Sequence, residues 1–170
     1  MSAFNIRSAR PDDAAAILAL HRRVAAEPGG LARQPEEVTE AYVAHAMSLA
    51  ADGGFNLVAV DADGGLRGEL HCERMKVQIF AHVLTDLTVA VDPAWQGRGV
   101  GSALFRALIS AARQASPPVR RIELWTGAAN LGAQRLYERL GFKIEGRMAA
   151  RGRLPDGSVD DDIVMGLLLD

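Results

Sequence analysis

The glycine-rich segment Gln96-Gly-Arg-Gly-Val-Gly101 contains the residues whose types and spacing point most directly to chemistry. It follows an apolar, β-branched run and a turn at Pro93, and it leads directly into a helical pattern. Glycine has no Cβ and reaches positive φ, so successive backbone N–H groups can turn toward one point. A helix that begins there adds unpaired N–H groups and the positive end of its dipole. The segment therefore predicts a seat for phosphate oxygens, as in a nucleotide-type ligand.

Spacing excludes two common phosphate-binding loops. A dinucleotide fingerprint requires a glycine three residues after the second, where this chain has Ser102. A P-loop requires Gly-Lys-Ser/Thr, but the only lysines, Lys76 and Lys143, lie elsewhere. For the loop taken alone, a glycine-rich turn that simply joins a strand to a helix remains the alternative.

A second block, Asn130 to Phe142, contains two further candidates. Asn130 stands where a helix N-cap is expected, which is an ordinary structural role for asparagine. Tyr137 shares a helical face with Ala133 and Leu136, so periodicity alone favours a core aromatic with a satisfied hydroxyl.

The run from Val89 to Leu104 closely resembles the acyl-CoA-binding motif of the GNAT superfamily of N-acetyltransferases. That motif is Gln/Arg-x-x-Gly-x-Gly/Ala, and here Gln96, Gly99 and Gly101 fill it. The block at 130–142 matches the same family and lies in the expected order. The resemblance extends well over residues 55–170 and covers the first fifty only by general pattern.

The resemblance implies acetyl-CoA as co-substrate, bound where the sheet splits between the strand ending at Val91 and the strand ending at Thr126. Asn130 would hydrogen-bond the pantetheine arm, and Tyr137 would protonate the departing thiolate. A phenol with a pKa near ~10 suits that donation. Main-chain groups would hold the rest of the ligand: Val89, Ala90 and Val91 the pantetheine amides, and Gly97, Arg98, Gly99, Val100, Gly101 and Ser102 the pyrophosphate.

Asp86 is the candidate general base, because many members of the family use a carboxylate near the start of this strand or a chain of waters. In a regular strand it would share a face with Thr88 and Ala90. A polar residue at a strand edge is the plain alternative. Glu69 and Glu73, on the preceding strand, are the fallback bases.

No metal site is expected. His71, Cys72 and Glu73 are adjacent, but neighbours in a strand point to opposite faces, so Cys72 cannot join the other two at one ion. His21 and His45 fall on helical patterns and are expected at the surface or at its boundary. Cys72 has no visible partner base, which disfavours an acyl-cysteine intermediate.

Composition indicates one domain over residues 1–170, of ordinary globular character with 49% apolar and 24% charged residues. The net charge of −2 gives no case for nucleic acid or an anionic membrane surface. No apolar run approaches the ~20 residues of a membrane-spanning helix, and the first ten residues lack the apolar stretch of a secretory signal. A single cysteine fits a reducing compartment, so we expect a cytoplasmic protein.

Hydrophobic periodicity predicts alternating helices and strands. Strands are expected at 5–7, 55–60, 66–72, 83–91, 121–126, 142–151 and 163–169, and helices at 14–26, 35–51, 99–115 and 131–140, with an irregular loop at 76–81. Gly141 should cap the last helix. The predicted fold class is α/β (α+β), a single-domain GNAT fold with a mixed central sheet splayed between two strands and helices on both faces.

We therefore expect an N-acetyltransferase that moves an acetyl group to a primary amine by direct attack in a ternary complex. The acceptor is expected to be an amino acid or small amine. A protein N-terminal or antibiotic acetyltransferase, or a non-catalytic acyl-CoA-binding module, is the alternative. Because members of the family commonly pair through their last strands, a homodimer is also expected.

Overall fold

The computed structural model describes residues 4–170 and places all the strands in one seven-stranded sheet with the order β1-β2-β3-β4-β5-β7-β6. Among the strand pairs within residues 4–170, only the β4–β5 pair is parallel. The strands are β1 (Phe4–Ser8), β2 (Phe55–Asp61), β3 (Leu66–Arg74), β4 (Val83–Val91), β5 (Arg121–Gly127), β6 (Lys143–Arg153) and β7 (Val159–Leu168).

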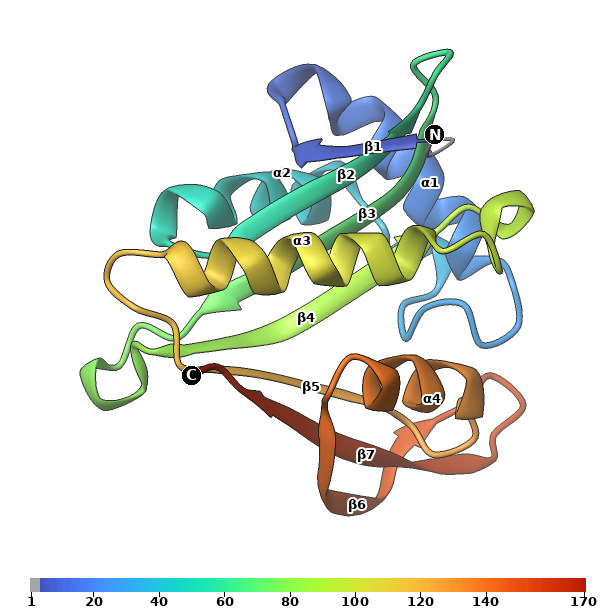
Figure 1. The fold of residues 1–170 in the computed structure, drawn as a ribbon. Coiled ribbons are helices and arrows are strands. Elements are labelled where there is room, and N and C mark those ends of the chain that lie inside the picture. Colours follow the sequence, from blue (N-terminus) through green and yellow to red (C-terminus); the bar gives the residue numbers. More distant parts are fainter. Residues whose placement is uncertain (1–3) are drawn as a thin grey trace.

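Helices cover both faces of this sheet, which confirms the predicted fold class (Figure 1). The first two lie behind the sheet in this view, and the third lies in front of β2, β3 and β4. None of the helices within residues 4–170 has the length and apolar character needed to cross a bilayer. They are α1 (Ala14–Ala25), α2 (Glu40–Ser48), α3 (Val100–Gln114) and α4 (Leu131–Arg139).

The helix predicted over 35–51 is wrong in its bounds. Pro35–Glu37 forms a separate 3-10 turn, and α2 begins only at Glu40. Thr39 fixes that start, because it has extended backbone angles and its side chain accepts the N–H of Tyr42 at 3.1 Å. Segment 76–81 is a loop with one 3-10 turn, which agrees with the irregular loop predicted there.

Strands β4 and β5 separate soon after they meet. They pair only at Val83 with Arg121 and at Leu84 with Ile122. Beyond that point β4 continues alongside β3, and β5 pairs with β7 along its whole length. The sheet is therefore splayed between these two strands, as the sequence predicted.

A β-bulge interrupts β4 just after the point of separation. Thr85 pairs with Glu73 and Thr88 with His71, so Asp86 and Leu87 together stand opposite one residue of β3. Asp86 has a φ of 47°, a left-handed conformation that is rare for residues with a side chain. The regular strand assumed for Asp86 from the sequence is therefore incorrect.

The main core lies between α3, α4 and the sheet. Phe105 of α3 is fully buried and meets the Tyr137 ring edge-on at 5.3 Å between centroids. Phe142, just after α4, packs against both rings at 6.0 Å. This aromatic cluster joins the two halves of the splayed sheet.

Close packing of α3 on β3 gives a test of the fold. A Cβ at Gly68 would lie 2.8 Å from Val100 Cγ1 and 3.0 Å from Leu104 Cδ1, both on buried side chains. We expect Gly68→Ala to lower the free energy of unfolding by about 1–3 kcal/mol in a urea titration. The matched control is Gly146→Ala, where a Cβ meets nothing within 4 Å. Equal stabilities of the two variants would contradict this packing.

Candidate active site

The gap between β4 and β5 continues into a cleft of about 730 Å³. Beyond Leu84 the main-chain groups of β4 that face β5 have no strand partner among residues 4–170. Such groups are strong donors and acceptors that need either a ligand or water. The cleft therefore offers an extended molecule a strand edge to pair with.

Ten of the predicted site residues line this cleft, although they come from three separate parts of the chain. They are Val89, Val91, Gln96, Gly97, Gly99, Val100, Gly101, Ser102, Asn130 and Tyr137. Val24 and the segment Glu27–Gly30, at the end of α1, also line it and were not predicted. Their pattern in the sequence is that of a helix end and a turn, which gives no sign of a ligand.

Ala90 and Arg98 are predicted to bind the same ligand through main-chain groups, which stays a prediction, and neither is among the residues that line the cleft. The Ala90 side chain is fully buried against Leu20 and Val24 on the opposite face, as strand alternation requires. Arg98 is exposed, and its guanidinium lies 5.1 Å from the centre of the Trp95 ring.

The loop before α3 presents free backbone N–H groups to the cleft. Gly97 and Gly99 have φ values of 72° and 85°, so the positive φ expected from the sequence is present. Within residues 4–170, no N–H from Gly97 to Ser102 donates to another backbone group outside the helix ladder. Because α3 has fifteen residues, its dipole adds to the attraction for an anion.

Asp92, which follows β4 directly, anchors the start of the segment that leads to the glycine-rich loop. Its carboxylate accepts the N–H of Ala94 at 3.0 Å and pairs with Arg23 at 3.2 Å and with Arg67 at 3.4 Å. Asp92 is buried, so these partners offset its desolvation. The end of β4 is thereby tied to α1 and β3 and is held ready for a ligand.

Tyr137 reaches the cleft from α4 with only 7% of its surface exposed. Burial raises the pKa of its phenol from 10.0 to about 12. The side chain is therefore both the core aromatic that periodicity favoured and a protonated donor at the cleft wall. At neutral pH the hydroxyl keeps its proton.

Asn130 caps α4 as expected, accepting the N–H of Ala133 at 3.1 Å through its side-chain oxygen. The amide end of the side chain remains available as a donor, and the residue lines the cleft. Gly141 ends the same helix with a φ of 98°, which confirms the predicted C-terminal cap.

The three candidate general bases, Asp86, Glu73 and Glu69, differ in their exposure and in their position relative to the cleft. Asp86 is exposed in the bulge of β4 and does not line the cleft. Glu73 is partly exposed and pairs with His45 at 3.2 Å. Glu69 is fully buried on the α1 side of β3. Asp86, beside the opening of the sheet, stays the prediction for the base.

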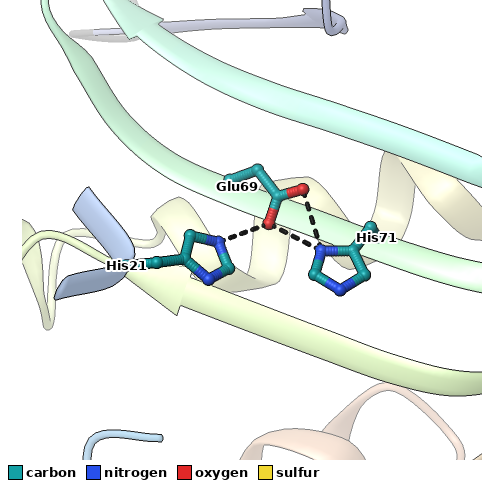
Figure 2. Close-up of side chains that lie close together, drawn as sticks. All are labelled: His21, Glu69 and His71. Carbon is teal, nitrogen blue, oxygen red and sulfur yellow. Dashed lines mark hydrogen bonds and ion pairs between the residues drawn. The ribbon is translucent and has the colours of Figure 1, made fainter. Parts of the chain in front are cut away.

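Glu69 belongs to a buried cluster that the sequence analysis missed (Figure 2). Its carboxylate accepts from His21 Nε2 at 2.8 Å and from His71 Nδ1 at 3.0 Å. His21 was expected near the surface but is fully buried. The missed signal is its place among the apolar residues Ile17 and Val24 on one face of α1.

Cys72, between these strand residues in sequence, faces the opposite side of the sheet, as alternation predicted. It is fully buried, and burial raises the pKa of its thiol to about 12. A thiol with this pKa is not a nucleophile at neutral pH, in agreement with the sequence-based expectation.

The family model of the acetyltransferase (GNAT) family matches residues 24–142, which include the loop, the strand edge and Tyr137. The chain belongs to the GNAT acetyltransferase family. The resemblance inferred from the two sequence blocks is thereby confirmed.

Two curated GNAT relatives match parts of the chain. The L-amino acid N-acetyltransferase AaaT of Escherichia coli K12 is 35% identical over 98 residues, 58% of this chain and 59% of that protein. An uncharacterized N-acetyltransferase of Methanocaldococcus jannaschii is 44% identical over 55 residues, 32% of this chain and 24% of that protein. The matched part of the chain thus spans about three-fifths of the length of AaaT and about a quarter of the length of the archaeal protein.

Solved GNAT structures match over nearly the whole chain. A GCN5-related N-acetyltransferase from Kribbella flavida has a TM-score of 0.86 at 28% identity, covering 98% of each chain. The structure of yncA from Salmonella typhimurium, solved with its cofactor acetyl-CoA, has a TM-score of 0.85 at 25% identity, covering 99% of this chain and 95% of that one.

The raised pKa of Tyr137 predicts a loss of stability at alkaline pH. An unfolded chain loses this proton near pH 10.0, whereas the folded protein keeps it until about 12. Stability is therefore full below pH 10 and declines as the pH rises toward 12. Tyr137→Phe should lack roughly 3 kcal/mol of that decline in denaturant titrations run across this range. Parallel pH curves for the two proteins would show that Tyr137 titrates normally.

Proposed function

We propose that this protein is an acetyl-CoA-dependent N-acetyltransferase whose acceptor is an amino acid or another small primary amine. The observation that carries the proposal is the cleft itself, which joins the unpaired edge of β4 to the free N–H groups before α3 and to Tyr137. The partial match to an L-amino acid N-acetyltransferase supports the choice of acceptor.

The residues of the cleft fit the parts of acetyl-CoA. The N–H groups from Gly97 to Ser102 suit the pyrophosphate, and the strand edge at Val89 and Val91 suits the pantetheine amides. A Cβ at Gly97 or Gly99 would meet nothing within 4 Å, so this loop is open toward the ligand. The yncA structure was solved with its cofactor acetyl-CoA, which supports acetyl-CoA as the co-substrate.

Transfer proceeds by direct attack of the amine nitrogen on the thioester carbonyl carbon. A main-chain N–H of β4 stabilises the developing oxyanion, the C–S bond breaks, and the amine loses a proton to Asp86 or to water. The thiolate takes its proton from Tyr137. Burial raises the pKa of the Tyr137 phenol to about 12, so this group still holds its proton when the thiolate forms beside it.

The acceptor enters where charge favours a cationic amine. Glu27, at the end of α1, lines the cleft and is exposed at its rim. Its carboxylate attracts an ammonium group before the proton is lost. An amino acid or short amine satisfies this requirement without an extended peptide-binding surface.

The first experiment follows thiol release from acetyl-CoA with a panel of amino acids and small amines, with products identified by mass spectrometry. We expect turnover with at least one acceptor. Tyr137→Phe should lower kcat by about 10²–10⁴-fold while the KM for acetyl-CoA stays nearly unchanged, because the ring still packs against Phe105 and Phe142. Wild-type protein that binds CoA but transfers to no amine would instead indicate a binding module.

A matched pair of glycine variants tests the phosphate loop. Gly99→Ala and Gly64→Ala place the same side chain at φ values of 85° and 83°, each in open space. Both should lose about 1–2 kcal/mol of stability, because left-handed backbone is unfavourable for alanine. Only Gly99→Ala should also weaken CoA binding in calorimetry. If both variants bind CoA equally well, the loop does not hold the pyrophosphate.

A further inference from the structure

The cluster of His21, Glu69 and His71 lies outside the proposed acetyl-transfer chemistry and joins two elements that are far apart in sequence. His21 comes from α1, and the other two residues alternate on one face of β3 (Figure 2). The side chains of His21 and Glu69 have no exposed surface, and that of His71 is 6% exposed. Three such polar groups need strong partners when they are removed from water.

The donor atoms of the cluster converge. His21 Nε2 lies 2.8 Å from Glu69 Oε2, and His71 Nδ1 lies 3.0 Å and 3.1 Å from the two carboxylate oxygens. One donor atom from each residue lies within 4.8 Å of the others. Two imidazole nitrogens and one oxygen of Glu69 supply three ligand atoms, and the second carboxylate oxygen, 3.0 Å from His71 Nδ1, is close enough to supply a fourth. That number satisfies a tetrahedral ion.

Tyr42 of α2 lies on the outer side of both imidazole rings. Its hydroxyl is 3.4 Å from His21 Nδ1 and 3.4 Å from His71 Nε2. When the inner nitrogens bind an ion, both outer N–H groups can donate to this one oxygen, which has two lone pairs. Metal-bound histidines regularly make such an outer hydrogen bond.

Without an ion, and with both imidazole rings neutral, the four ring nitrogens cannot all be paired by Glu69 and the Tyr42 hydroxyl. Both inner nitrogens must then donate to Glu69, which leaves two outer nitrogens as acceptors. The single hydroxyl proton of Tyr42 can serve only one of them. A divalent ion bound by the inner nitrogens removes this mismatch, as an added proton on one ring also would.

The buried carboxylate of Glu69 has its pKa set by the two neighbouring imidazoles. Desolvation would raise the pKa of Glu69, but His71 and the hydrogen bonds from His21 and His71 outweigh it and hold the pKa below its usual value. The two imidazoles that lower this pKa are the same neighbours whose inner nitrogens lie beside the carboxylate.

We propose that His21, Glu69 and His71 bind one divalent transition-metal ion of the zinc type at the contact of α1 with β3. Imidazole nitrogen with one carboxylate suits zinc, whereas calcium and magnesium prefer oxygen ligands alone. The burial leaves no opening for a substrate, so the ion is structural. It fixes α1 against the strand whose His71 pairs with Thr88, next to Val89 at the cleft.

Zinc binding by the full-length protein tests the site. After dialysis against a chelator, calorimetry with Zn²⁺ and elemental analysis should show one equivalent bound, and Tm should rise on addition. His71→Gln should abolish this binding. Tyr42→Phe keeps the ring beside Arg33 and removes only the outer hydroxyl, so it should weaken Zn²⁺ binding by about 10-fold or more.

The chain supplies a matched control in the exposed pair of His45 and Glu73, 3.2 Å apart on the same side of the sheet. His45→Gln should leave the stoichiometry and the affinity unchanged. A folded wild-type protein that takes up no Zn²⁺, or one whose binding follows His45 rather than His71, overturns the proposal. If His71→Gln fails to fold, an affinity unchanged by Tyr42→Phe overturns it equally. These readouts do not depend on acetyl transfer.

Discussion

The early separation of β4 from β5 is the constraint on which the rest of the structure depends. Each strand stays paired on its other side, β4 with β3 through one bulge and β5 with β7 along its whole length, so the sheet opens while these pairings remain. The open edge is left with main-chain groups that must find partners. An extended acyl carrier with amide groups meets that need, which is why binding capacity follows from the topology itself.

Packing on the two faces holds the opening in place. On one face, Phe105, Tyr137 and Phe142 form an aromatic contact that bridges the two halves of the sheet. On the other, α1 is tied to the end of β4 through the ion pair of Arg23 with Asp92. The same helix supplies His21 to the buried cluster. The proposed cofactor cleft and the proposed metal site therefore share the contact of α1 with the sheet.

One physical effect, desolvation, gives three different results in this protein. Tyr137 and Cys72 are buried without a charged partner, and the pKa of each rises to about 12. Glu69 is buried as deeply, but two imidazoles reverse the effect and hold its pKa down. Burial therefore keeps a proton on the phenol at the cleft and a negative charge inside the cluster, and the difference lies in the partners.

The family resemblance implied the splayed mixed sheet. The sequence itself determined what is local: the glycine-rich loop before α3, the cap at Asn130, and the ends of α3 and α4. These features depend on neighbouring residues, whose propensities and spacing are printed in the chain. Only the tertiary structure decided the bulge at Asp86, the burial of His21, and the meeting of His21 with Glu69. The last pair is separated by 48 positions. No local pattern encodes such a contact, because it arises only when a helix packs its buried face on a particular strand.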